Sequence, residues 1–311
     1  MPAVIDWHAH HTPPELIERF VALGEKPPRM DPEDDADFER RISDMDDAGI
    51  DVQLVSPGAG VNGDRFGAEK AMDLARLAND VIAERISSYP DRLIGDVSIT
   101  LKDPEGSIQE IERMAARGFR AVMLFAQPQA VGLPDTDRIL GKVAEIGLPI
   151  FLHGGGAGGR QDPSLERLED GGAGVQVSVG ADSAVSDFCV RLIAAGTFDR
   201  YPSLQIVIRS SGGSVPLLLN KLYWKHKSQE GEERRYSDIL LDHFLVDCAS
   251  SNAVKLRFLK DTMGEDRVVF GSDYCGGSGP LTRAVAVLRD QIDPSSTIAA
   301  MERTSRPLLK L

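Results

Sequence analysis

The chain has 311 residues, of which 42% are hydrophobic and 27% are charged, and its formal net charge at pH 7 is −13. This composition is typical of a globular protein with a buried core, and the acidic balance argues against a nucleic-acid partner, whose phosphates require a basic surface. With no apolar run of about 18 residues and no basic start followed by an apolar segment, we expect neither a membrane-spanning helix nor a signal peptide. Three widely spaced cysteines, Cys189, Cys248 and Cys275, fit buried thiols in a reducing, cytoplasmic location.

Short apolar runs alternate with segments of helical spacing along the whole chain. Strands are predicted at residues 3–7, 52–56, 93–98, 120–124, 148–152, 204–209, 244–248 and 267–271. Helices are predicted at about 36–48, 66–88, 105–117, 135–146, 181–196, 213–228, 252–263 and 279–291. Eight strands, each followed by a helix, predict an α/β fold, a single-domain (β/α)8 TIM barrel over residues 1–311. A doubly wound open sheet is the alternative, but it would place a glycine-rich phosphate loop after the first strand, where this chain has histidines.

Two segments interrupt the repeat. Residues 12–35 carry five prolines and are predicted to form a long loop after the first strand. Residues 154–180, after the fifth strand, begin with a glycine-rich run. In a barrel both loops lie at the carboxyl ends of the strands, where sites are built, so both are candidate lids. For the glycine-rich run, a flexible insertion is the alternative.

The sequence Asp-Trp-His-Ala-His at residues 6–10 ends the first predicted strand. His8 and His10, one residue apart on a strand, point to the same face and can reach one cation. Such a pair alone is often structural, but His153 and Asp273 end the fifth and last predicted strands in the same way. Because the carboxyl ends of barrel strands meet at one mouth, these four residues predict a mononuclear metal site with one position open for water or substrate.

The chain resembles the amidohydrolase-related family that includes aminocarboxymuconate-semialdehyde decarboxylase, the resorcylate and carboxyvanillate decarboxylases and oxalomesaconate hydratase. The resemblance covers nearly the whole chain and rests on IDWHAHHTP at 5–13, MDDAGID at 45–51, YPDR at 89–92, FDRYPSLQIVI at 198–208 and GSDY at 271–274. It implies a distorted barrel, one divalent metal ion (usually zinc, sometimes manganese) and often a homodimer. By the family's pattern Asp273 is also the candidate proton carrier, and the metal ligands would be His8, His10, His153 and Asp273.

One position departs from this family. After the sixth strand the family usually has His-x-Gly-Gly-x-x-Pro, whereas residues 210–216 read Ser-Ser-Gly-Gly-Ser-Val-Pro, so Ser210 stands where the histidine belongs. A serine hydroxyl can hydrogen-bond a substrate oxygen as part of the catalytic site, but it cannot act alone as a general base. His226, predicted late in a helix, and His243, predicted at the far end of the seventh strand, are not placed to replace the histidine.

Three arginines are predicted to bind a substrate carboxylate, because guanidinium pairs with carboxylate through two hydrogen bonds. They are Arg29 in the first long loop, Arg160 in the glycine-rich loop and Arg209 at the end of the sixth strand. Strand alternation leaves open whether Arg209 faces the pocket. Asp247, at the end of the seventh strand, is open between reaching the site and supporting it, and His11 is expected to face away from the histidine pair.

These features favour a metal-dependent enzyme that removes carbon dioxide, without oxidation, from a small carboxylated compound with an aromatic or ring-derived skeleton. Decarboxylation depends least on the missing histidine, because one acid, Asp273, suffices to protonate the ring carbon. One alternative is hydrolysis of an amide, lactone or C–C bond by metal-bound hydroxide. Another is a non-catalytic homologue that binds metal and ligand but has lost turnover together with the histidine that Ser210 replaces.

Overall fold

Eight parallel strands form one closed sheet in the order β1-β2-β3-β4-β5-β6-β9-β10. The computed structural model describes residues 1–26, 38–154, 175–228 and 231–311. The sheet closes because the Trp7 N–H donates to the Phe270 carbonyl at 2.9 Å and the Asp273 N–H donates to the His8 carbonyl at 2.7 Å. The predicted (β/α)8 barrel is therefore confirmed and the open sheet is excluded. Its strands are β1 (Ile5–His10), β2 (Val52–Ser56), β3 (Leu93–Ser98), β4 (Ala121–Phe125), β5 (Ile150–His153), β6 (Ile206–Ile208), β9 (Phe244–Asp247) and β10 (Val268–Val269).

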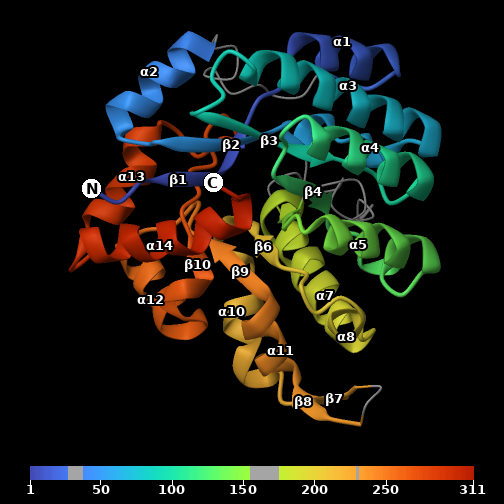
Figure 1. Cartoon of the computed structure of the whole chain (residues 1–311), viewed down its shortest axis with the longest axis vertical. Coiled ribbons are helices and arrows are strands. Elements are labelled where there is room, and N and C mark those ends of the chain that lie inside the picture. The colour runs from blue at the N-terminus through green and yellow to red at the C-terminus, as the bar shows by residue number, and fades with distance from the viewer. Residues whose placement is uncertain (27–37, 155–174, 229–230) are drawn as a thin grey trace.

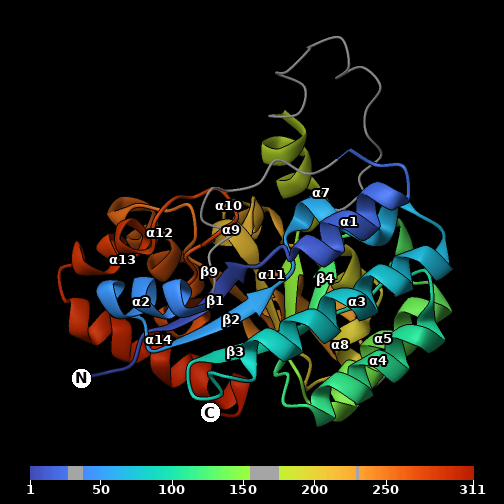
Figure 2. The same cartoon turned by 90° about the horizontal axis from the view of Figure 1, so that it is seen from above.

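Helices surround the strands (Figure 1), and the two termini lie together on the side away from the start of α7 (Figure 2). No helix among the described residues is long and apolar enough to cross a membrane. The main helices are α1 (Pro14–Ala22), α2 (Phe38–Ala48), α3 (Ala68–Ile86), α4 (Pro104–Ala116), α5 (Pro134–Ile146), α7 (Ala181–Ala194), α8 (Thr197–Arg200), α10 (Val215–Leu218), α11 (Tyr236–His243), α12 (Ala253–Met263), α13 (Leu281–Arg289) and α14 (Pro294–Leu309).

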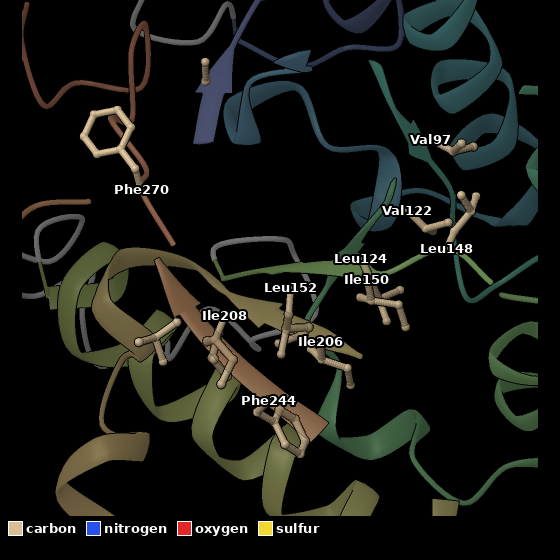
Figure 3. Close-up of a cluster of buried hydrophobic side chains, with 14 of the residues drawn as sticks. Val97, Val122, Leu124, Leu148, Ile150, Leu152, Ile206, Ile208, Phe244 and Phe270 are labelled. Atoms are coloured by element: carbon tan, nitrogen blue, oxygen red, sulfur yellow. The ribbon is translucent and has the colours of Figure 1, made fainter. Parts of the chain in front are cut away.

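Alternation along the strands divides the core into two layers. The layer between strands and helices includes Val122 and Leu124 of β4, Ile150 and Leu152 of β5, and their neighbours in Figure 3. The strand residues that alternate with those of the outer layer point into the barrel interior. Apolar side chains therefore lie on both faces of the strands, as is typical of parallel strands. The interior cluster consists of Ile5, Trp7, Leu54, Ile94, Ala121, Phe151, Val207, Leu245, Val269 and Leu309.

The helix expected at residues 213–228 is wrong. Only α10 and a short 3-10 turn (Leu219–Lys221) form there, and the chain continues into an antiparallel hairpin of β7 (Lys225–Lys227) and β8 (Glu233–Arg235). The hairpin projects from the barrel (Figure 1). His226 therefore lies on a strand, where its Nε2 is 2.6 Å from the Asp199 carboxylate. The apolar residues of this segment do not form one buried helical face: Val215 and Leu222 are buried, whereas Leu217, Tyr223 and Trp224 are exposed.

Three helices of eight or more residues were not predicted from the sequence: α1, α11 and α14. The segment expected to be a long loop at 12–35 contains α1, whose Leu16 and Phe20 are buried; residues 27–37 of it lie outside the described part. After the last predicted helix, α14 crosses the amino ends of the strands. Its Ser305 hydroxyl accepts from the Trp7 indole N–H at 2.8 Å, and Leu309 joins the interior cluster. The barrel therefore needs a ninth, non-repeating element to close its floor.

Asp96 on β3 is a buried acid whose two carboxylate oxygens have no hydrogen-bond partner among the described residues. It lies two residues after Ile94, which belongs to the interior cluster. Burial raises the pKa of Asp96 well above its ordinary value, and only the backbone N–H of Asp96 itself opposes that shift. The folded protein therefore keeps a proton that the unfolded chain releases. This contribution to stability is complete below the ordinary aspartate pKa of 3.8 and is lost as pH rises.

We expect the Asp96→Asn variant to lose this pH dependence, because an amide cannot ionise. The difference in free energy of unfolding between variant and native protein should grow in favour of the variant as pH rises above the ordinary aspartate pKa of 3.8. Urea unfolding at several pH values measures it, with the exposed Asp187→Asn as the matched control. Parallel stability profiles for the native protein and the Asp96 variant would contradict the interpretation.

Candidate active site

Three buried histidines meet at the carboxyl ends of β1 and β5. One ligand atom each from His8, His10 and His153 lie within 4.8 Å of one another. Their rings pack edge to face, with centroids 5.0, 5.5 and 5.3 Å apart. The pairing of β1 with β2 shifts register between Asp6 and Ala9. Such an irregularity re-aims side chains at a barrel rim, and here both Trp7 and His8 face the interior.

Each of these histidines uses its Nδ1 atom to contact an oxygen and leaves Nε2 for the centre of the cluster. His10 Nδ1 lies 3.2 Å from the Pro57 carbonyl oxygen, and His153 Nδ1 bonds the Gly154 carbonyl oxygen. His8 Nδ1 lies 2.7 Å from a buried carboxylate. Because these oxygens are acceptors, each ring donates its Nδ1–H and carries its lone pair on Nε2. This is the neutral form in which imidazole binds a metal ion.

Asp273, in the segment after β10, adds a carboxylate to the three rings. Its Oδ1 lies 3.2 Å from His8 Nε2 and 3.4 Å from His10 Nε2, and its Oδ2 accepts from the Ser278 hydroxyl at 2.5 Å. A Cβ atom on Gly276 would lie 2.0 Å from Asp273 Oδ1, so only glycine fits there. Burial raises the pKa of Asp273, but interactions with His8, His10 and Ser278 outweigh it and hold the pKa well below its usual range.

The donor atoms fit a single ion. Two nitrogens that bind one ion at about 2.1 Å lie about 3.0–3.4 Å apart, and His8 Nε2 and His10 Nε2 are 3.1 Å apart. Three imidazoles and one carboxylate suit zinc, manganese or a similar divalent ion. The structure thus brings His8, His10 and His153 together and places the Asp273 carboxylate beside His8 and His10.

Asp247, at the end of β9, orients His8 and does not join the cluster directly. Its Oδ2 receives the His8 Nδ1–H at 2.7 Å, while its Oδ1 accepts the backbone N–H groups of Ser211 and Ala249, both at 3.0 Å. Three hydrogen bonds therefore fix the orientation of this buried carboxylate. The sequence left open whether Asp247 reaches the site or supports it. In the structure, Asp247 supports the proposed metal ligand His8.

Replacing Asp247 with asparagine is expected to weaken metal binding by about 10- to 100-fold. The two backbone donors would hold the amide oxygen, so the amide nitrogen would face His8 Nδ1 and force the proton onto Nε2, where it blocks the metal. Competition with a chelating dye measures the affinity. Asp199→Asn is the matched control, because Asp199 also pairs with a histidine, His226, away from the site. Equal metal affinity in native protein and the Asp247 variant would contradict this role.

A buried network behind the ligands ties β1 to the segment after β10. Asp6 accepts backbone N–H groups from both segments at 3.1 and 2.9 Å, and it accepts the Ser272 hydroxyl at 2.6 Å. Arg41 of α2, only 2% exposed, donates to the His10 carbonyl at 2.5 Å and to Gln53 at 2.6 Å. Gln53 in turn donates to Asp6 at 2.9 Å. Sequence analysis missed this network because its members lie up to 266 positions apart and share no pattern.

Arg209 and Ser210 border the histidines from β6. Val207 faces the barrel interior, so alternation turns Arg209 inward as well. Its Nη1 donates to the Ser210 hydroxyl at 3.1 Å. Ser210 and Ser211 adopt left-handed φ angles of 51° and 65° in the short turn labelled α9 (Arg209–Gly212). Such strain in residues with a Cβ concentrates at functional sites.

Of the other predicted residues, Arg29 and Arg160 lie outside the described part of the chain. His11 packs edge to face on Phe38, away from the cluster, as expected. His243 is buried at the end of α11, where its Nδ1 contacts the Leu204 carbonyl, so it is structural. Sequence analysis also missed Ser278, because a hydroxyl five residues after Asp273 carries no pattern of its own.

A family model described as Amidohydrolase matches residues 5–304. The chain belongs to the amidohydrolase family. This amidohydrolase is 28% identical to gamma-resorcylate decarboxylase from Rhizobium radiobacter over 257 residues, which cover 75% of each chain. Its fold is similar to that of 5-carboxyvanillate decarboxylase from Sphingomonas paucimobilis, with a TM-score of 0.82 at 21% identity over 100% of both chains.

The fold of the amidohydrolase is also similar to that of a dihydroxybenzoic acid decarboxylase from Polaromonas sp. JS666, solved with bound manganese and the inhibitor 2-nitroresorcinol. The TM-score is 0.81 at 21% identity, and the alignment covers 100% of this chain and 98% of the other. At such identities these two structures establish a shared fold.

Proposed function

We propose that this amidohydrolase catalyses the non-oxidative decarboxylation of a small aromatic carboxylate at one divalent metal ion. The observation that carries the proposal is the convergence of three buried histidines at the barrel mouth, with the Asp273 carboxylate oxygen beside two of them. The ion, zinc or manganese, would supply an electrophilic centre for oxygen atoms of the substrate. Gamma-resorcylate decarboxylase, the relative described above, and the manganese-containing fold neighbour support this choice of reaction. The proposed metal ligands are His8, His10, His153 and Asp273.

Asp273 is the proposed proton carrier. Its pKa lies well below the usual range, so at neutral pH it starts as a carboxylate that can accept the proton of a ring hydroxyl. Once protonated it is a strong acid, able to deliver that proton to the ring carbon that bears the carboxylate. The bond to the carboxylate carbon then breaks, its electron pair returns to the ring, and carbon dioxide leaves.

We propose that arginines bind the substrate carboxylate, with Arg209 at the histidines and Arg29 and Arg160 contributed by the two long loops. Ser210 keeps a hydroxyl proton that it can donate to a substrate oxygen while its own oxygen accepts from Arg209. Ser210 stands directly after β6 where the family usually has a histidine, which argues against hydrolysis, because water activation depends on a base more than ring protonation does.

We further propose a homodimer in the cytoplasm. Leu217, Tyr223 and Trp224 are 68%, 65% and 61% exposed, and the two aromatic rings stack at 4.9 Å beside a groove of about 580 Å³. Exposed apolar patches of this kind commonly mark subunit contacts. The three buried thiols support a reducing compartment. Sedimentation of the native chain tests the dimer, and a monomeric mass would overturn it.

The reaction is tested with carboxyl-labelled 2,6-dihydroxybenzoate, other hydroxybenzoates and 5-carboxyvanillate on manganese- and zinc-loaded protein. Mass spectrometry follows both the labelled carbon and the ring product. We expect labelled carbon dioxide and a product that has lost one carboxylate. Addition of water without labelled carbon dioxide would favour hydrolysis. Tight binding of these acids by metal-loaded protein without conversion would identify a non-catalytic homologue.

A further inference from the structure

We infer that Arg209 takes the place of the missing histidine after β6, as a fixed positive charge that binds the substrate carboxylate beside the metal site. The inference rests on the proposed function, because it assumes an ion at the three histidines. It goes beyond the proposed function in two ways. Arg209 is the residue that contacts the substrate carboxylate, and Ser210 positions the Arg209 side chain.

The register of the sheet places Arg209 next to His153. Leu152 of β5 pairs with Ile208 of β6, so the residues that follow them, His153 and Arg209, lie side by side at the barrel mouth. Ile208 packs in the outer layer and Val207 in the interior cluster. The Arg209 side chain therefore enters the mouth from the same side as the metal ligand.

Contacts with Gly154 and Ser210 fix the position of the Arg209 guanidinium. A Cβ atom on Gly154 would lie 2.9 Å from Arg209 Nη2, so the absence of a side chain at Gly154 makes room for the group. The Ser210 hydroxyl accepts from Nη1 at 3.1 Å. Nε is buried and has no partner among the described residues, so the guanidinium keeps donors for a ligand.

The charge of Arg209 reaches the metal-binding histidines. Gly154, whose carbonyl accepts the His153 Nδ1–H, also lies against Arg209 Nη2, so the guanidinium borders the site beside His153. Asp182 at the start of α7 is the described carboxylate whose pKa Arg209 lowers, although burial raises that pKa overall, and Asp182 forms no ion pair with Arg209. A guanidinium and a divalent ion that border one space repel each other unless an anion lies between them. A substrate carboxylate would supply that anion.

This arrangement has a kinetic signature. Arginine remains protonated in proteins, so the guanidinium stays charged and takes no part in proton transfer. It contacts the carboxylate in the substrate, before the negative charge moves into the ring. Loss of Arg209 should therefore raise KM and Kd more than it lowers kcat.

The test compares binding of benzoate and benzamide to manganese-loaded protein by calorimetry. The two probes share one shape and differ in charge, and benzoate has no ring hydroxyl to activate it for decarboxylation. We expect the native protein to bind benzoate at least about tenfold more tightly than benzamide. Arg209→Met should weaken benzoate binding by about 10- to 100-fold and leave benzamide unchanged. Arg209→Lys should restore part of the preference for benzoate over benzamide. Ser210→Ala should weaken this preference by a few-fold, because the guanidinium loses its hydrogen bond to the Ser210 hydroxyl.

The exposed Arg138→Met is the matched control and should bind both probes as the native protein does. Metal content is measured for every variant, so that loss of the ion is separated from loss of the carboxylate contact. Because the readout is binding, the inference can hold even where no carbon dioxide is released. Equal affinity of the native protein for benzoate and benzamide would overturn it, as would an Arg209→Met variant that still prefers benzoate.

Discussion

Asp273→Asn is expected to lower kcat for decarboxylation by about 100- to 10,000-fold, the range typical of losing a general acid–base group. Asparagine has the same shape and tolerates the left-handed backbone that Asp273 adopts at φ 58°, so the fold should survive. The amide cannot accept a proton from a ring hydroxyl and return it to the ring carbon. Initial rates of carbon dioxide release at saturating substrate measure the effect.

The exposed Asp187→Asn serves as the control for this substitution, because it removes an aspartate of α7 that pairs with Arg191 on the surface. Metal content of the Asp273 variant must be measured in parallel. A metal-loaded Asp273→Asn protein with near-native kcat would show that another group carries the proton.

His153→Ala is expected to abolish metal binding at the metal concentrations that can be used in the assay. Activity should be lost together with the metal. Loss of a direct ligand should weaken affinity by more than the roughly 10- to 100-fold that follows loss of a residue behind a ligand. The buried ring also packs against Phe125 at 5.4 Å and against His8 and His10, so some loss of stability is expected. Metal analysis after dialysis, together with thermal unfolding, separates the two effects.

His226→Ala is the matched control, because His226 lies on the projecting hairpin and should leave metal content unchanged. Added imidazole should restore part of the metal binding of His153→Ala by entering the vacated space. Full metal occupancy and activity in a folded His153→Ala protein would remove His153 from the centre.

The barrel could be predicted from the sequence because its signals are local. Each strand is a short apolar run, and glycines such as Gly49, Gly118 and Gly147 adopt the positive φ angles that end helices before the next strand. The proposed metal ligands could also be predicted from the sequence, because the carboxyl ends of the strands meet at one mouth in this fold. His8, His10, His153 and Asp273 each end or follow a strand.

Features that depend on contacts distant in sequence could not be predicted. The pairing of His8 with Asp247 joins residues 239 positions apart, and the floor contact of Trp7 with Ser305 spans 298. The hairpin at 225–235 could not be predicted, because the apolar residues before it have a spacing that suggested a helix, although Leu217, Tyr223 and Trp224 remain exposed. The inward direction of Arg209 was open because the exact end of β6 fixes the alternation, and strand ends are poorly defined by sequence.

Ser210, which stands where the family usually has a histidine, bears on the choice between decarboxylation and hydrolysis. A missing histidine alone suggests a damaged site, but the charged Arg209 beside it and the room made by Gly154 suggest a site adapted to bind an anion. On this view a titratable base has been replaced by a permanent charge. Such a change favours decarboxylation over hydrolysis, because only hydrolysis requires a proton to be taken from water.

The central claim is that four side chains hold one divalent ion at the barrel mouth. Anomalous diffraction from crystals of manganese-loaded protein, measured near the manganese edge, tests it most directly. We expect one strong peak enclosed by His8, His10, His153 and Asp273, and no peak at that place in crystals of His153→Ala. A native crystal in which manganese binds elsewhere, or in which this position shows no anomalous signal at saturating manganese, would contradict the account.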